Sequence, residues 1–299
     1  MATLQEITDR VKTAVGADSG LGKSLKFDLK GDGFIHINGG EVSNEDLPAD
    51  LTWRAWEHGP SKLLLNELEQ RFNADMIAHL RSVGVKVPIA TTSTWGGNGL
   101  SALPALSVGD VIDAHSYGDA GQLEKNPLTS DGMIDWIAAA QVVGKPLTVT
   151  EWNSEPFPTP DRHAVPLYLA GTASYQGWDA MMQYAYSQEG LSGGWMTVGN
   201  WNLYNDPALL STFPAAALLY RRGDVAEAKT TYAFAPTPDT LFGQAITPSN
   251  SALLRTAMEK GKLQIAPIKF RDEQHLFQIA QRIVNQVGRR VDQTTPLAD

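Results

Sequence analysis

The sequence predicts an α/β fold built on a parallel sheet, and two observations carry this prediction. Short apolar runs alternate along the chain with amphipathic segments, which is the order that parallel strands joined by crossover helices require. The apolar runs are continuous, as expected of strands that are buried on both faces. A small α+β segment precedes this region and a short β-containing extension follows it.

The N-terminal segment predicts a helix followed by a hairpin. Apolar residues recur at helical spacing over 4–14, and Gly16 follows them as a stop signal. Residues 24–37 then alternate apolar and polar side chains around the turn residues 30–33, which is typical of a β-hairpin. We interpret residues 1–56 as one small segment that packs on the main domain.

The main region, residues 57–225, predicts a long helix and then four parallel strands. The helix has apolar residues at every fourth position over 64–80, and Gly84 follows as its stop. Two helical patterns, 131–143 and 162–177, separate later strands. The strands lie in VKVPIATTSTWGG, VGDVIDAHSYG, GKPLTVTEWN and WDAMMQYAYSQ.

Polar and aromatic residues follow each predicted strand. Because active sites of α/β folds gather where parallel strands end, we expect these side chains to lie together. One carboxylate, one histidine and several rings suit a sugar, since rings stack on a pyranose while polar groups bind its hydroxyls. The strand ends are Ser93, Thr94 and Trp95, then His115, Ser116 and Tyr117, then Glu151, Trp152 and Asn153, then Gln183, Tyr184 and Tyr186, with Trp195 and Trp201 in the following loop.

Two other tryptophans are expected outside this site, and the composition argues against several classes of partner. Trp136 and Trp178 lie within helical patterns, so we expect them in the core. The net charge of −9 and the lack of a basic block argue against nucleic acid as a partner. The six histidines are scattered, so we expect no catalytic metal and no cofactor. No apolar run approaches membrane-spanning length and no signal peptide is visible, so we expect a soluble, cytoplasmic protein.

Two motifs resemble the retaining (β/α)8 glycoside hydrolases, cellulase-like enzymes among them. PLTVTEWN resembles their seventh-strand motif, and DAHSYG is similar to their sixth-strand His-x-Tyr. The resemblance covers about residues 61–266 and implies a partial (β/α)8-barrel-like sheet. It implies Glu151 as the nucleophile, oriented by His115 and Tyr117, which also contact the sugar. Trp195 or Trp201 would form the sugar platform.

The resemblance also implies a second carboxylate, in an Asn-Glu pair that ends strand four. The pair near the right place is Asn66-Glu67. As a strand, residues 62–67 would make Glu67 the catalytic acid, whereas as a helix they would make it a surface residue. The helical pattern is the stronger of the two. Four other acidic residues lack a motif: Asp113, Glu155, Asp179 and Glu189. We expect Asp113 to lie deeper in the fold than His115, in a hydrogen-bonded role.

A second resemblance concerns residues 1–53, which are similar to the opening of the sterol carrier protein domain. It implies a lipid-binding or sterol-binding carrier as an alternative function. A catalytically inactive carbohydrate-binding module is the other alternative, since rings can bind sugar without an acid. Only four βα units fit the main region, so the N-terminal hairpin or a second copy in a homodimer would cover the open sheet edges.

The C-terminal part predicts one more barrel helix and a small extension. The helix would begin at Pro214 and end at Gly223. The sequence of residues 226–299 predicts a small β-containing extension and, over 272–290, an amphipathic helix. We identify no chemistry there.

Overall fold

The structure is a computed structural model, and its described residues form two compact units. The first unit includes residues up to Phe72 and Pro236–Ala245, and the second includes Asn73–Ala235 and residues 246–267. The expected domain division at 1–56, 57–225 and 226–299 stays a prediction. The described residues are 27–29, 35–37, 60–94, 99–118, 123, 126, 129–154, 159–188, 201–237, 241 and 251–266.

The described part of the first unit contains the predicted hairpin. Strand β1 (Phe27–Leu29) pairs with β2 (Ile35–Ile37) in antiparallel register, with Phe27 opposite Ile37. This confirms the hairpin between the two strands. The helices expected over 4–14 and 272–290 lie outside the described residues.

Helix α4 (Pro60–Ser82) confirms the helical interpretation of the long apolar pattern. The alternative, a strand ending at Glu67, is wrong because 62–67 lie within this helix. The expected apolar stripe is only partly buried, since Phe72 is 55% exposed and Met76 45% exposed. The chain leaves the helix through Gly84, whose φ of 95° lies in the left-handed region that glycine adopts at low cost.

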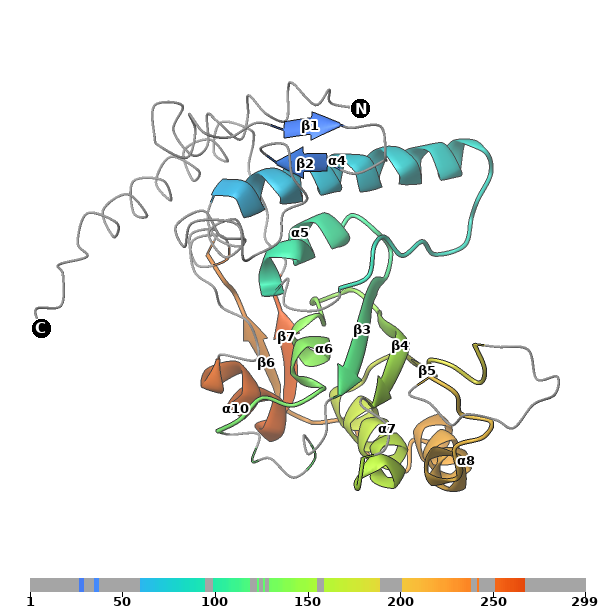
Figure 1. Ribbon diagram of the computed structural model, residues 1–299. Coiled ribbons are helices and arrows are strands. Elements are labelled where there is room, and N and C mark those ends of the chain that lie inside the picture. The colour runs from blue at the N-terminus through green and yellow to red at the C-terminus, as the bar shows by residue number, and fades with distance from the viewer. Residues whose placement is uncertain are drawn as a thin grey trace, which may run out of the picture. The chain divides into compact units, whose positions relative to one another are not determined.

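Parallel strands form the centre of the second unit (Figure 1). They are β3 (Ile112–Gly118), β4 (Leu147–Ser154) and β5 (Ala180–Gln183), in that spatial order. The first expected strand forms only isolated parallel bridges to the segment that contains β3, at Ala90 and Thr94. Four chain segments therefore lie side by side in sequence order, as the alternating pattern predicted.

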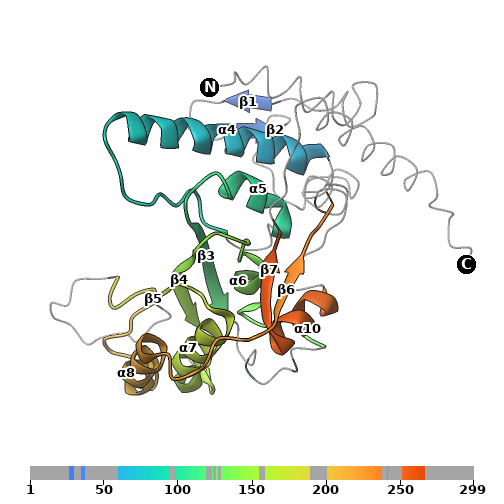
Figure 2. The same ribbon diagram turned by 180° about the vertical axis from the view of Figure 1, so that it is seen from behind.

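Two helices that follow β4 and β5 pack against each other in the second unit (Figure 2). They are α7 (Val165–Gln176), preceded by the short turn η3 (Arg162–Ala164), and α8 (Pro207–Arg222). Trp178, between the end of α7 and β5, is 3% exposed, which confirms its place in the core. The helix expected over 131–143 is much shorter, α6 (Asp135–Ala139), and Trp136 lies in it without a described side chain. Two further short helices are η1 (Gly99–Ala102) and α5 (Leu103–Leu106).

Helix α8 begins seven residues before the proline that was expected to start it. The carboxylate of Asp206 caps the helix by accepting hydrogen bonds from the backbone N–H groups of Ala208 (3.0 Å) and Leu209 (3.2 Å). Pro207 occupies the first turn, where no N–H is needed. Pro214 therefore lies inside the helix, while Gly223 ends it as predicted, with a φ of 68°.

The predicted β-containing extension is present. Strands β6 (Thr231–Phe234) and β7 (Lys262–Ile265) form a parallel pair, with α10 (Ala252–Lys260) before β7. The buried amide of Gln176 joins this extension to α7, since it donates to the carbonyls of Met258 (2.8 Å) and Gly261 (2.9 Å). Its oxygen accepts from the N–H of Leu263.

The fold is thus a mixed α/β fold with one parallel sheet of three strands and another of two. Within the described ranges the strands do not close into a barrel. Strand β5 lies at the edge of its sheet, and its residue Met182 is 52% exposed. Whether a second copy covers this edge stays a prediction. Over the same ranges, no helix has the length and apolar character needed to cross a membrane.

Asp135, at the start of α6, is a buried carboxyl group that responds to pH. It is 2% exposed, and burial raises its pKa from 3.8 to about 7. Its Oδ2 accepts a hydrogen bond from the N–H of Gly132 (2.7 Å). Nearby Asp131 and Glu259 also raise the pKa, while Arg255 opposes them.

We expect Asp135 to lower the free energy of unfolding as the pH rises from 4 to 7. In this window the folded chain holds a proton on Asp135 that the unfolded chain has lost, so this group contributes a slope of about −1.4 kcal/mol per pH unit. Asp135→Asn stays neutral and removes the slope. In urea unfolding at pH 5, 6, 7 and 8, the free energy of unfolding of the variant should increase relative to that of the native chain as the pH rises. Parallel stability curves would contradict this assignment.

Candidate functional site

A β-bulge in β4 aims the candidate nucleophile out of the core. Leu147 and Val149 are fully buried, so simple alternation would also bury Glu151. The pairing with β3 runs from Val149 opposite Ala114 directly to Glu151 opposite His115, which leaves Thr150 as the extra residue. The bulge reverses the alternation, because a bulge turns the following side chains to the other face. Glu151 therefore lies on the same side as His115.

Strand β3 supplies three side chains to this side of the sheet and packs its other side tightly. Ala114 and Ser116 have no exposed surface, and the Ser116 hydroxyl donates to the carbonyl of Met133. The alternate residues are Asp113, His115 and Tyr117. This alternation brings a carboxylate, an imidazole and a phenol into one row beside Glu151.

Glu151 receives two polar contacts through a single oxygen. The Tyr117 hydroxyl donates a hydrogen bond to Glu151 Oε2, and His115 Nδ1 lies 3.3 Å from the same atom. The side chain of Glu151 is 31% exposed, so its carboxylate reaches solvent. The expectation that Tyr117 would hold this carboxylate agrees with the contact. A fixed, ionisable and accessible carboxylate can act as a nucleophile, a base or an anchor for a hydroxyl group.

Asp113 lies beneath His115 and is held by hydroxyl groups. Its Oδ2 accepts hydrogen bonds from Ser93 Oγ and from Thr150 Oγ1 (2.7 Å), and its Oδ1 accepts from Thr148 Oγ1 (2.7 Å). The group is 4% exposed, which agrees with the expected deep, hydrogen-bonded role. A buried carboxylate needs such donors, because nothing else compensates its lost hydration.

A row of aromatic rings begins at Tyr117, whose hydroxyl bonds the Glu151 carboxylate. The Trp201 ring meets the ring of Tyr117 edge to face at 4.8 Å and that of Tyr184 at 6.0 Å between centroids. The chain segments that carry Trp201 and Tyr184 are joined, since the N–H of Ala185 donates to the carbonyl of Trp201 (2.9 Å). These rings extend from the carboxylate to the loop after β5, where Tyr186 is 60% exposed.

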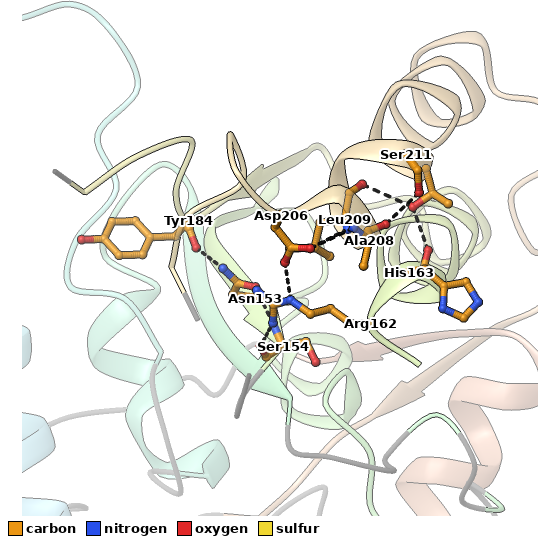
Figure 3. Close-up of polar contacts among 10 residues, drawn as sticks. Asn153, Ser154, Arg162, His163, Tyr184, Asp206, Ala208, Leu209 and Ser211 are labelled. Carbon is orange, nitrogen blue, oxygen red and sulfur yellow. Dashed lines mark hydrogen bonds and ion pairs between the residues drawn. The ribbon is translucent and has the colours of Figure 1, made fainter. Parts of the chain in front are cut away.

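A buried ion pair fixes the end of β4 (Figure 3). Arg162, in η3, donates from Nε to Asp206 Oδ2 and from Nη1 to the carbonyl of Ser154. Arg162 is 1% exposed and Asp206 has no exposed surface. The amide of Asn153 also bonds in this region, donating to the carbonyl of Tyr184 (2.5 Å). The last residues of β4 are thus tied to the segments that begin α7 and α8.

Two expected sugar-binding residues are buried instead. Trp152 is 4% exposed and stacks on Phe213 with ring centroids 6.3 Å apart. Asn153 has no exposed surface. The bulge at Thr150 explains the position of Trp152, because it turns Trp152 inward when it turns Glu151 outward. Asn153 lies opposite Tyr117, on the side of Glu151, and is buried there with its amide bonded to the carbonyl of Tyr184.

The structure brings together part of the expected site. Glu151, His115, Tyr117, Tyr184 and Trp201 are connected by the contacts above. Trp95, Trp195, Glu155 and Glu189 lie outside the described residues.

Two acidic residues that sequence analysis considered lie in other settings. Glu67 lies on α4, where its carboxylate pairs with Arg71 at 2.8 Å, so the strand-end position that would have made it the acid is not present. Asp179 Oδ2 accepts from the N–H of Leu147 (2.9 Å), at the opposite end of β4 from Glu151.

Sequence analysis missed the hydroxyl groups around Asp113 and the ion pair of Arg162. A signal for the first was present, because Thr148 and Thr150 put hydroxyls at every second position of an otherwise apolar strand. The ion pair had no such signal, since Arg162 and Asp206 are far apart in sequence and polar residues are usually exposed.

Comparisons of the chain with protein-family models, with curated proteins and with solved structures found no match. The chemistry of this site therefore rests on its own geometry.

We expect Asp206→Ala to destabilise the second unit by about 3–5 kcal/mol, because it leaves the Arg162 guanidinium buried without its partner and uncaps α8. Urea unfolding of the variant, followed by tryptophan fluorescence and far-UV circular dichroism, measures this loss. Asp224→Ala is the control, since the ion pair of Asp224 with Arg222 lies at the surface and should contribute less than about 1 kcal/mol. Equal stability of the two variants would contradict the role given to the buried pair.

Proposed function

We propose that this protein is a glycoside hydrolase-like enzyme that cleaves β-glycosidic bonds of an oligosaccharide or polysaccharide with retention, using Glu151 as the nucleophile. The observation that supports the proposal most directly is the Glu151 carboxylate, bonded by Tyr117, contacted by His115 and exposed at the end of β4. The position agrees with where parallel α/β sheets carry their active sites. The resemblance of the β3 and β4 motifs to cellulase-like enzymes supports the same reaction.

The two contacts on Oε2 select the oxygen that reacts. Tyr117 and His115 both approach Oε2 of Glu151. Oε1 is therefore the oxygen left to attack the anomeric carbon. In that step the bond from Oε1 to the anomeric carbon forms, and the bond from this carbon to the leaving oxygen breaks. Hydrogen bonds to the spectator oxygen keep the carboxylate oriented, which lowers the entropic part of the barrier.

Trp201 and Tyr184 are the proposed sugar platform. The Trp201 ring meets that of Tyr117, whose hydroxyl bonds the nucleophile, and the Tyr184 ring meets that of Trp201. Ring faces bind the C–H face of a pyranose, and the hydroxyl of Tyr184 adds a polar group, which accepts from the amide of Gln188 (2.9 Å). His115 is expected to contact the sugar as well.

The proposed reaction also requires an acid/base group. A retaining mechanism needs a second carboxyl group about 5 Å from the nucleophile. In the sequence Glu155 follows β4 by one residue and Glu189 follows β5 by six, and both are outside the described residues. A catalytically inactive carbohydrate-binding protein would use the same rings without this group, and the labelling experiment below separates the two functions. A lipid carrier draws support only from the resemblance at residues 1–53.

We expect a 2-deoxy-2-fluoro glycoside with a dinitrophenolate leaving group to label Glu151. Such a leaving group departs without acid assistance, so the reaction tests the nucleophile alone. The measurement is intact mass, which rises by one fluoroglycosyl group, followed by peptide mapping to Glu151. Glu151→Gln is the control and should not be labelled. If a folded native chain gains no mass from any sugar of a broad panel, the proposed reaction is wrong.

Tyr117→Phe should slow this labelling about 10- to 100-fold, because a hydrogen bond to a charged group contributes about 1.5–3 kcal/mol. The ring that meets Trp201 is kept, so sugar binding should change less than the rate. Tyr220→Phe is the matched control: it removes a phenol hydroxyl that donates to the carbonyl of Trp178, far from Glu151 in the chain. The comparison is made on the first-order labelling rate at saturating reagent. Equal rates for both variants would show that Tyr117 does not orient the nucleophile.

A further inference from the structure

The hydrogen bonds around His115 determine where its ring carries a proton. Thr150 Oγ1 lies 2.7 Å from Asp113 Oδ2 and 3.0 Å from His115 Nε2. A threonine hydroxyl has a single proton, and an ionised carboxylate can only accept. The Thr150 proton therefore points to Asp113, and Thr150 Oγ1 must accept from Nε2. The Asp113 Oδ2 atom, 3.4 Å from Nε2, attracts the same proton.

The other ring nitrogen then faces the nucleophile. His115 Nδ1 lies 3.3 Å from Glu151 Oε2. If Nδ1 were unprotonated, its lone pair would face a carboxylate oxygen, which is repulsive. The contact is attractive when the pair holds one proton, on Nδ1 or on the carboxyl group. His115 thus lies between two carboxyl groups, with a protonated Nε2 on the buried side and a shared proton on the exposed side.

We infer that Asp113 is a positioning residue for Glu151: through Thr150 it fixes the Nε2 proton of His115, and it thereby makes His115 and Glu151 share one proton. The catalytic consequence rests on the proposed function. When Glu151 attacks the anomeric carbon it becomes a neutral ester, and the shared proton stays on Nδ1. Asp113 stabilises the resulting imidazolium from the opposite side of the ring. No proton enters or leaves the group in this step.

The surroundings of Asp113 fit this role better than a purely structural one. Besides Thr150, Ser93 and Thr148 donate hydrogen bonds to its carboxylate, and these bonds compensate part of its lost hydration. The group is 4% exposed, whereas the side chain of His115 is 19% exposed and that of Glu151 31%. A buried charge, an imidazole and an accessible carboxylate therefore follow one another from the interior to the surface.

The test is long-range proton–nitrogen NMR of the histidine rings of the full chain, with His115→Gln used to assign the signal. We expect Nε2 of His115 to be protonated in the native chain. In Asp113→Asn the amide can donate to Thr150, which frees the Thr150 proton for Nε2, so Nε2 should lose its proton while the proton at Nδ1 remains. Asp179→Asn is the matched control, because it removes a carboxylate from the far end of β4 and should leave the signal unchanged.

The second readout is the rate of Glu151 labelling by the fluoroglycoside, which should fall about 10-fold in Asp113→Asn and stay within about twofold in Asp179→Asn. An unprotonated Nε2 in the native chain, or an Asp113→Asn variant with native signal and native rate, would overturn the inference. The two proposals fail separately. Absence of labelling in the native chain contradicts the glycosidase, while the NMR signal alone decides the proton position.

Discussion

The buried ion pair between Arg162 and Asp206 is the interaction on which the site's geometry depends. One guanidinium bonds the carbonyl of Ser154 at the end of β4 and the carboxylate that caps α8. The end of β4 and the turn η3, which are close in sequence, therefore meet the start of α8, 44 residues beyond Arg162, at one buried charge. A buried pair of this kind contributes little net stability compared with apolar packing, but breaking it is costly, so it acts on position more than on stability. It fixes the strand end only three residues beyond Glu151.

The two faces of the sheet differ in character, one apolar and the other polar. One face of β3 and β4 buries apolar residues such as Ile112 and Val149 against the rest of the second unit. The other face carries acidic, imidazole and hydroxyl groups that bond one another and leave Glu151 accessible. A polar face of this kind is stable only when its donors and acceptors are matched, and Asp113 shows that matching in detail.

Much of the fold could be predicted from the sequence, because continuous apolar runs and helical periodicity are local signals. The parallel order of β3, β4 and β5, the hairpin and the extension all follow from them. Three features were not predictable from such signals. The exposure of Phe72 and Met76 depends on what packs against α4. The start of α8 was misplaced because both Pro207 and Pro214 could begin a helix. The burial of Trp152 depends on the bulge at Thr150. Within the site, residue types indicated Glu151, His115 and Tyr117, but only the backbone geometry could separate Glu151 from its neighbours.

The bulge at Thr150 makes the site depend on backbone register as well as on residue type. If β4 ran without the bulge, with Thr150 opposite His115, every side chain of the motif would still be present, yet the carboxylate would point into the core and the indole outward. The site can thus be lost by a shift of register that leaves the sequence untouched. Substitution alone would have to rebuild both faces of β4 to restore it.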